Sequence, residues 1–212
     1  MTFLHQLRTG RRTPGTLSAG VALLAIAAIA PASANAAACT QIVTGPHSGV
    51  LNVAANQKLC MSGATQTGAV NVAPGGGLSV SGSIITGAIT LQDGYTEFRM
   101  CASKTVRGAI SATGGRTAIM IGGAGLGALL CPANTIDGAV TLATNKAGVT
   151  LAGNRIAGAV ASTGNLVRTT LSANQIGGAL TCKYNIPAPV NAGVANAVVG
   201  GRSGQTCAVT TF

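Results

Sequence analysis

The chain has 212 residues, of which 47% are hydrophobic and only 8% are charged, and its formal net charge is +10 at pH 7. It contains no tryptophan, two tyrosines and three acidic residues. So few aromatic side chains argue against sugar-stacking platforms and against nucleic-acid binding by base stacking. The surface must therefore be built mostly from Thr, Ser, Asn and Gly.

The first 36 residues are expected to be a secretory signal peptide, because basic residues precede a short apolar run at residues 21–30 and small residues then offer cleavage after Ala34 or Ala36. That run is shorter than the ~18 apolar residues that span a bilayer, so no integral membrane segment is expected after cleavage. Lipidation of Cys39 is disfavoured, because the leucine that usually lies three residues before a lipidated cysteine is absent. The remaining roughly 176 residues suit one domain and carry a net charge of about +7.

A short motif recurs along this remaining chain. A glycine followed by Ala or Val and then by an apolar residue occurs seven times, at Gly49, Gly68, Gly87, Gly108, Gly138, Gly158 and Gly178. The motifs are about 20 residues apart, except for one interval of about 30 that holds an extra half-unit, Gly127-Ala128-Leu129. A fixed short period of this kind is the signature of a repeat architecture.

Apolar columns accompany the glycines. One lies two residues after each glycine, and another lies seven residues before it, at Ile42, Met61, Val80, Cys101, Cys131, Leu151 and Leu171. Because strand side chains alternate between faces, we expect the stretch from two residues before to four after each glycine to be one strand. The glycine then faces inward and leaves room for the opposite wall.

Turns are expected in the two gaps between the apolar columns, and both gaps hold asparagines at intervals of about 20 residues. One series is Asn134, Asn154 and Asn174, and the other is Asn145, Asn165 and Asn185. Asparagine tolerates the left-handed conformation of tight turns, and stacked asparagines can form an amide ladder. The pattern predicts an all-β fold, a parallel β-solenoid with about 20 residues per coil over residues 37–181.

Six cysteines lie in this part of the chain, and an even number in an exported protein favours disulfides over metal or redox chemistry. Cys39 and Cys60 are placed to staple the first coils, and Cys101 and Cys131 share one column. Cys182 and Cys207 bracket a segment rich in Pro and Gly, which we expect cannot continue the coils. Residues 182–212 are therefore expected to form a stapled cap, although spacing alone leaves other pairings open.

Three stretches of the chain are distinctive: LSVSGSIITGAITL (residues 78–91), VTLAGNRIAGAV (149–160) and the ending NQIGGALTCKYNIPAPVNAGVANAVVGGRSGQTC (174–207). In these stretches the chain resembles a family of small secreted actinobacterial proteins. The resemblance covers essentially all of the chain after residue 36. It implies a right-handed parallel β-helix with a disulfide-closed tail, and it implies no activity and no functional residues. A looser likeness to bactofilins rests on the glycine rhythm alone, and the cysteines and the leader depart from that pattern.

Catalysis by a carbohydrate-active β-helix enzyme generally needs two carboxylates about 5–10 Å apart. Asp93 and Glu97 are the one nearby acidic pair, but Asp93 begins a turn signature and Glu97 is expected to form a surface ion pair with Arg99. Asp137 is expected to point outward, and His47 is expected in a turn without a partner histidine. We therefore expect no catalytic, cofactor-binding or metal site.

Two hypotheses of binding remain. Basic residues are candidate contacts to an anionic wall polymer, or they only keep the surface soluble: Lys104, Arg107, Arg116, Lys146, Arg155, Arg168 and Lys183. Their positions in the repeat differ, so a single basic stripe is not assured. An outward column with Thr90, Ser111, Thr141 and Thr181 would suit ice binding, but Asn71 and Ala161 interrupt it.

The sequence favours an exported, non-catalytic β-solenoid with a structural or adhesive role at the cell surface or in the extracellular matrix. It would act by self-association or by contact with a wall polymer, without nucleic acid. The alternatives are a carbohydrate-active β-helix enzyme and, more distantly, an ice-binding protein. An acidic cleft on one parallel face would favour the enzyme.

Overall fold

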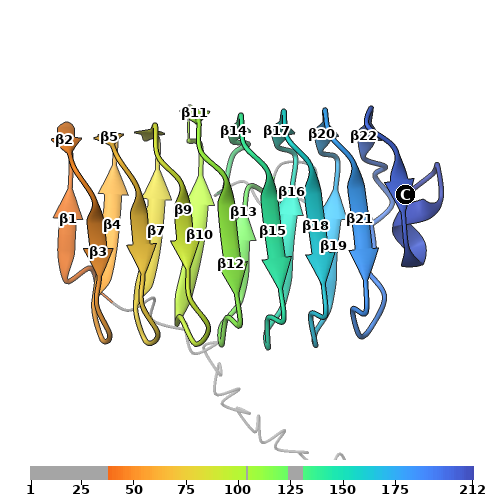
Figure 1. Ribbon diagram of the computed structural model, residues 1–212, viewed down its shortest axis with the longest axis horizontal. Coiled ribbons are helices and arrows are strands. Elements are labelled where there is room, and N and C mark those ends of the chain that lie inside the picture. The colour runs from red at the N-terminus through yellow and green to blue at the C-terminus, as the bar shows by residue number, and fades with distance from the viewer. Residues whose placement is uncertain (1–37, 104, 124–130) are drawn as a thin grey trace, which may run out of the picture. The chain divides into compact units, whose positions relative to one another are not determined.

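The computed structural model describes residues 38–103, 105–123 and 131–212. The expected signal peptide, Lys104 and the half-unit at residues 127–129 lie outside the described residues. The described chain forms a parallel β-solenoid with about eight coils of about 20 residues, which confirms the predicted fold class (Figure 1). Each full coil contributes one strand to each of three parallel sheets.

The three sheets follow from a regular order of strands. Sheet A has seven strands: β1 (Gln41–Val43), β4 (Lys58–Ser62), β7 (Gly77–Ser81), β10 (Glu97–Cys101), β13 (Ile119–Ile121), β16 (Val149–Ala152) and β19 (Thr169–Ser172). Sheet B has eight: β2 (Pro46–Ser48), β5 (Thr65–Thr67), β8 (Ile84–Ile85), β11 (Thr105–Val106), β14 (Thr135–Ile136), β17 (Arg155–Ile156), β20 (Gln175–Ile176) and β22 (Ala197–Val198).

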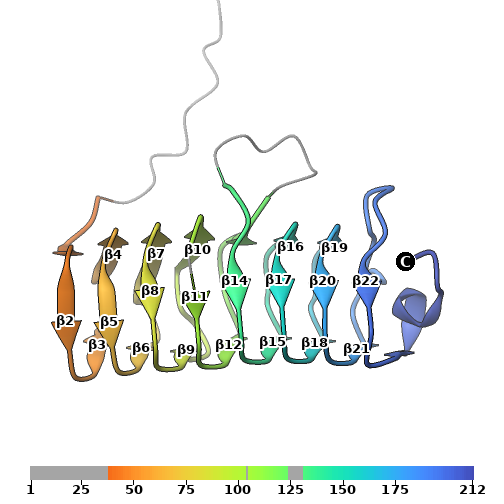
Figure 2. The same ribbon diagram turned by 90° about the horizontal axis from the view of Figure 1, so that it is seen from above.

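Sheet C also has eight strands: β3 (Leu51–Val53), β6 (Val70–Val72), β9 (Ile89–Leu91), β12 (Ile110–Thr113), β15 (Val140–Ala143), β18 (Val160–Thr163), β21 (Leu180–Lys183) and β23 (Arg202–Ser203). A short 3₁₀ helix, η1 (Gln205–Ala208), follows it. Turned by 90°, the molecule shows the strands of sheet B side by side from β2 to β22 (Figure 2).

The core is made of apolar side chains that repeat at the same place in successive coils. The predicted column two residues after each glycine is buried and in register through sheet C, from Leu51 and Val70 to Val160 and Leu180. The column predicted seven residues before each glycine is wrong at three places. Ile42 is 67% exposed and Val43 takes its inward place, while Met100 pairs with Val80 where Cys101 was expected. Both of these changes are slips of one residue, which reverse the face of a strand. At the third place, Ile121 pairs with Leu151 where Cys131 was expected.

The glycine of each motif lies at a third turn, not inside a strand as predicted. In the coil of Gly158, β17 ends at Ile156 and β18 begins at Val160, and the two strands belong to different sheets. A Cβ added to Gly158 would lie 2.6 Å from the main-chain oxygen of Gly138 in the coil before. The glycine therefore makes room for the neighbouring coil, not for the opposite wall.

The predicted asparagine ladders form, and they are buried. Within each series the main-chain N–H and the side-chain Nδ2 of one asparagine both donate to Oδ1 of the asparagine in the next coil, at 2.8–3.1 Å. Nδ2 also donates to a main-chain oxygen of the preceding coil, as Asn165 does to Leu142 at 3.0 Å. Both donors of each carboxamide are thereby satisfied in a place that excludes water.

The asparagines themselves do not adopt the predicted left-handed conformation. The residue before each of them does in most turns: φ is 49° at Thr144, 62° at Gly164 and 56° at Tyr184. That residue makes the sharp turn, and the asparagine after it points inward. The asparagine is selected for its buried carboxamide and not for its backbone freedom.

The ladders extend further than the sequence indicated. Asn196 continues the first series and its Nδ2 donates to the main-chain oxygen of Phe212 at 3.0 Å. Gln205 continues the second series, because Asn185 donates to its Oε1 at 2.8 Å. At the other end of the second ladder, Tyr95 Oη donates to Asn145 Oδ1 at 3.0 Å.

All six cysteines form disulfides in the predicted pairs, Cys39–Cys60, Cys101–Cys131 and Cys182–Cys207. The tail beyond Cys182 differs from the expectation that it cannot continue the coils. β22 pairs with β20, β23 pairs with β21, and Val190 forms a bridge to Thr170. The tail thus adds one irregular coil, and η1 and the last disulfide follow it.

We predict that Gly158→Ala destabilises the protein by about 1–3 kcal/mol, because its methyl group overlaps the main chain of the coil before. Gly148→Ala is the matched control, since a Cβ there would have its nearest neighbour at 3.8 Å. Urea unfolding followed by circular dichroism measures both variants. Equal unfolding midpoints for the two variants would contradict the close packing of glycines.

We predict that Asn165→Ala lowers the free energy of unfolding by at least about 3 kcal/mol, because it strands buried donors of Asn145 and buried acceptors of Asn185 and Leu142. Asn71→Ala removes an exposed asparagine pair with Asn52 and should change stability by less than about 0.5 kcal/mol. A small effect of Asn165→Ala in the same unfolding assay would show that the ladder contributes little.

Candidate functional site

The acidic residues that were considered for catalysis are each held by a lysine. Asp93 lies in the turn after β9 and its Oδ1 is 3.6 Å from Lys146 Nζ, with both side chains largely exposed. Glu97 begins β10 and its Oε1 is 2.7 Å from Lys58 Nζ, with both side chains mostly buried. Glu97 thus forms a mostly buried ion pair with Lys58, where a surface ion pair with Arg99 was expected, and Arg99 Nε lies 3.3 Å from Cys101 Sγ.

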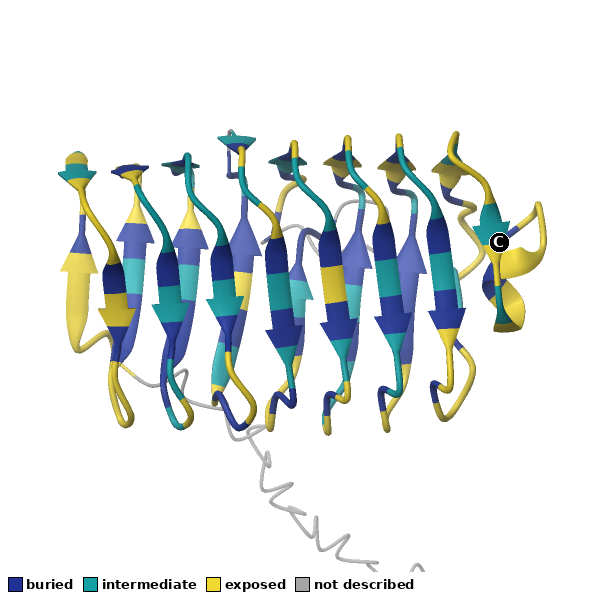
Figure 3. Ribbon diagram, viewed as in Figure 1, coloured by how far each residue is buried: buried dark blue, intermediate teal, exposed yellow. Residues whose placement is uncertain are grey.

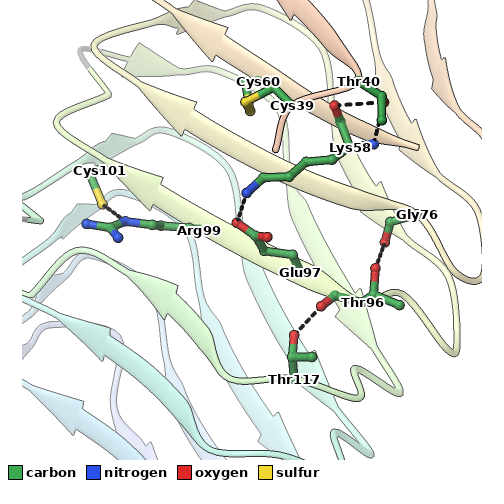
Figure 4. A network of polar contacts seen from close by, with 10 residues as sticks. All are labelled: Cys39, Thr40, Lys58, Cys60, Gly76, Thr96, Glu97, Arg99, Cys101 and Thr117. Carbon is green, nitrogen blue, oxygen red and sulfur yellow. Dashed lines mark hydrogen bonds and ion pairs between the residues drawn. A yellow bond between two sulfur atoms is a disulfide. The ribbon is translucent and has the colours of Figure 1, made fainter. Parts of the chain in front are cut away.

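Lys58 reaches Glu97 across an intervening coil (Figure 4). In sheet A, Lys58 pairs with Gly77 and Gly77 pairs with Glu97, so the two charged residues are two coils apart. Gly77 has no side chain between them, and a Cβ there would lie 3.2 Å from the Cβ of Glu97. The ion pair links three coils near the start of the solenoid.

The structure also places His47 and Asp137, the two other residues discussed as candidates. His47 lies in β2 and not in a turn, and its Nδ1 is 2.8 Å from Gln66 Oε1 in the next coil. Asp137 is exposed after β14, as expected. Among the described residues, no three His, Cys, Asp or Glu side chains come together as metal ligands would.

Burial raises the pKa of Tyr95 well above its usual range. The ring is fully buried, and its hydroxyl donates to Asn145 at the first rung of the second ladder. A tyrosinate there would lose this donated hydrogen bond and would lie in a place without water. Tyr95 therefore serves the fold as a neutral donor.

The structure gathers four of the candidate basic residues at one corner and leaves the others elsewhere. This corner, which we call the C–A corner, consists of the turns that lead from sheet C to sheet A, along the lower edge of Figure 1. It carries the exposed side chains of Arg116, Lys146, Arg168 and Lys183. Arg107 and Arg155 are exposed at sheet B, and Lys104 lies outside the described residues.

Main-chain hydrogen bonds hold the turns of the C–A corner in register. Lys146 N donates to Gly115 O at 2.8 Å, Leu166 N to Asn145 O at 2.9 Å, and Ile186 N to Asn165 O at 2.8 Å. Arg116, Lys146, Leu166 and Ile186 therefore stand in one row, about 4.8 Å apart from coil to coil. The two ends of this row differ, because the first two members are cationic and the last two are apolar.

The apolar part of this corner was not predicted from the sequence. Leu166 is 55% exposed and Ile186 is 68% exposed. The signal was available, because each of these residues directly follows a ladder asparagine, where Lys146 follows Asn145. In Figure 3, most turns of the C–A corner carry exposed stretches beside buried ones.

Two other surfaces lie on sheets C and B. The threonine column of sheet C is in register, but Asn71 and Ala161 do stand in it, and Ala161 pairs with Thr141 and Thr181. A shallow groove of about 400 Å³ lies on sheet B between Arg155 and Val199, over the small residues Ala157 and Gly177. Its lining holds one charged side chain and no carboxylate.

The chain has no match among protein-family models, curated proteins or solved structures.

No helix in the described ranges is long and apolar enough to cross a membrane. The three disulfides indicate an extracellular or otherwise oxidising environment.

We predict that raising the pH above about 10 destabilises the protein more steeply than it destabilises the Tyr95→Phe variant. The raised pKa means that the unfolded chain releases the phenolic proton first, so the stability present below about pH 10 is lost as the pH rises. Urea midpoints at about pH 9 and pH 11 measure this difference for both proteins. Parallel losses of stability in the two proteins would argue against a neutral, buried Tyr95.

Proposed function

We propose that the chain is an exported, non-catalytic β-solenoid with an adhesive or structural role at the cell surface or in the extracellular matrix. It attaches to an anionic wall polymer through the C–A corner. The observation that carries this proposal is the gathering of Arg116, Lys146, Arg168 and Lys183 along that one corner.

Charge balance supports an anionic partner. The chain has only three acidic residues, and of these Asp93 alone stands at the C–A corner, where it is shared with Lys146. Glu97 is neutralised by Lys58 in sheet A. Positive potential along an exposed edge attracts a polyanion over a distance of about one Debye length, ~8–10 Å at physiological salt.

The non-catalytic part of the proposal rests on the way the carboxylates are used. Asp93 and Glu97 each face a lysine from a different coil, which stabilises the coils against one another. A pair for glycoside hydrolysis would instead need to converge on a shared cleft. The groove on sheet B is lined mostly by small and apolar residues.

The test is co-sedimentation of the purified protein, with its disulfides intact, with isolated cell walls and in a wall-free tube. We predict pelleting with walls only, reversed by salt. Arg168→Gln with Lys183→Gln should weaken binding roughly tenfold or more, because each cation near an anionic surface contributes about 1 kcal/mol.

Arg107→Gln with Arg155→Gln is the matched control, because it removes the same charge from sheet B and leaves the C–A corner intact. Equal weakening by the two pairs would reject the corner as the site and leave a diffuse charge effect. Protein that stays soluble in both tubes would refute wall attachment and assembly into a polymer together.

A further inference from the structure

The C-terminal half of the C–A corner exposes an unusual concentration of apolar side chains. Nine large apolar side chains are exposed in the described part of the chain, and four of them lie on two adjacent turns of this corner: Leu166, Val167, Tyr184 and Ile186. Their exposed fractions range from 40% for Val167 to 78% for Tyr184. Scattered apolar residues are common on protein surfaces, but a contiguous group marks an interaction site.

Basic residues flank this apolar group directly. Arg168 follows Val167 in one turn, Lys183 precedes Tyr184 in the next, and both are exposed. Lys146 stands beside Leu166 in the row of the corner. Apolar side chains at the tip with cations around them are the composition of segments that lie in the interface of an anionic membrane.

The turn at Tyr184 presents an aromatic ring to solvent, with 78% of its surface exposed. Tyr184 has φ of 56°, in the left-handed region, as Gly164 and Thr144 do at the equivalent place in the two preceding coils. A glycine adopts this conformation more readily than a bulky side chain. The fold requires only the left-handed backbone here, and the exposed ring adds to the apolar group of the corner.

We propose that this apolar part of the C–A corner, Leu166, Val167, Tyr184 and Ile186, docks on the surface of an anionic lipid bilayer. A row of turns along a convex edge can meet a flat surface, whereas it cannot enclose a small ligand. Leu166 and Ile186 enter the boundary between headgroups and acyl chains, Tyr184 lies at headgroup level, and Arg168 and Lys183 contact lipid phosphates. A second copy of the chain is a poorer occupant, because it would bring the same cations together.

This lipid contact goes beyond the proposed wall attachment and does not depend on it. Contact with a hydrophilic wall polymer would require the cations alone, whereas contact with lipid requires the apolar side chains as well. The two contacts are therefore separated by substitutions that change only Leu166 and Ile186.

The test uses vesicles of phosphatidylglycerol and phosphatidylcholine in equal parts, with pure phosphatidylcholine vesicles and a soluble polyphosphate as comparison probes. Because residues 21–30 are apolar and would bind lipid themselves, the protein is recovered after export and its N-terminus is checked by mass spectrometry. We expect binding to the anionic vesicles and about tenfold weaker binding for the Leu166→Ser, Ile186→Ser double variant.

The matched control is the Ile42→Ser, Val50→Ser double variant, because these two exposed apolar residues lie on the first coil. It should bind the anionic vesicles as the unaltered protein does.

The proposal is overturned by no binding to the anionic vesicles, by equal binding to the pure phosphatidylcholine vesicles, or by equal effects of the two double variants. If polyphosphate displaced the protein from the vesicles and the Leu166→Ser, Ile186→Ser double variant bound them unchanged, the corner would be assigned to polyanions alone. A dimer in sedimentation velocity that Ile186→Ser dissociates would assign the apolar group to a second copy.

Discussion

Buried carboxamides that must all be hydrogen-bonded are the constraint on which the solenoid depends. Each ladder asparagine donates at least two bonds from Nδ2, and each lies within a few per cent of complete burial. Oδ1 accepts one bond in Asn134 and at least two in the others, as in Asn165. A slip of one residue in any coil would leave several of these groups unpaired without water, at a cost of about 1–3 kcal/mol each. The ladders therefore fix the coil length, and from Asn134 to Asn185 the interval is an unvarying 20 residues. The earlier coils have Ala64 and Ser83 at that turn, and there the interval varies.

The outward surface is free of this constraint, and it is there that the coils differ from one another. Regular turns hold unlike side chains in a single row, so that Arg116 and Lys146 continue into Leu166 and Ile186. The fold thus works as a scaffold on which each coil contributes one position to a linear surface. A binding surface in such a protein is formed by residues from several coils and not by one segment of the chain.

The sequence predicted the architecture well because inward positions repeat. The glycine motif, the sheet C column from Leu51 to Leu180 and the ladders follow from spacing. The cysteine positions suggested the three disulfides that form, although spacing alone left other pairings open. The third turn was missed because Gly158 lies at even spacing from Ile156 and Val160, so alternation alone does not distinguish a bend from a continuous strand. The C–A corner was missed for a different reason. Its residues face solvent, where no packing rule selects the side chain, and only the register of the turns shows that Arg168 and Lys183 flank the same row.

The disulfides divide the solenoid into covalently locked and unlocked lengths. The bonds join cysteines that are 21 positions apart in Cys39–Cys60, 30 in Cys101–Cys131 and 25 in Cys182–Cys207. Residues 61–100 and 132–181 lie outside the loops that these bonds close. A tether that pulled on both ends of the chain would lengthen only the unlocked coils. Each released coil of 20 residues would extend to about 70 Å, whereas it occupies about 4.8 Å of the stack. Under load the molecule would then lengthen one coil at a time, and the three disulfides would limit the total extension.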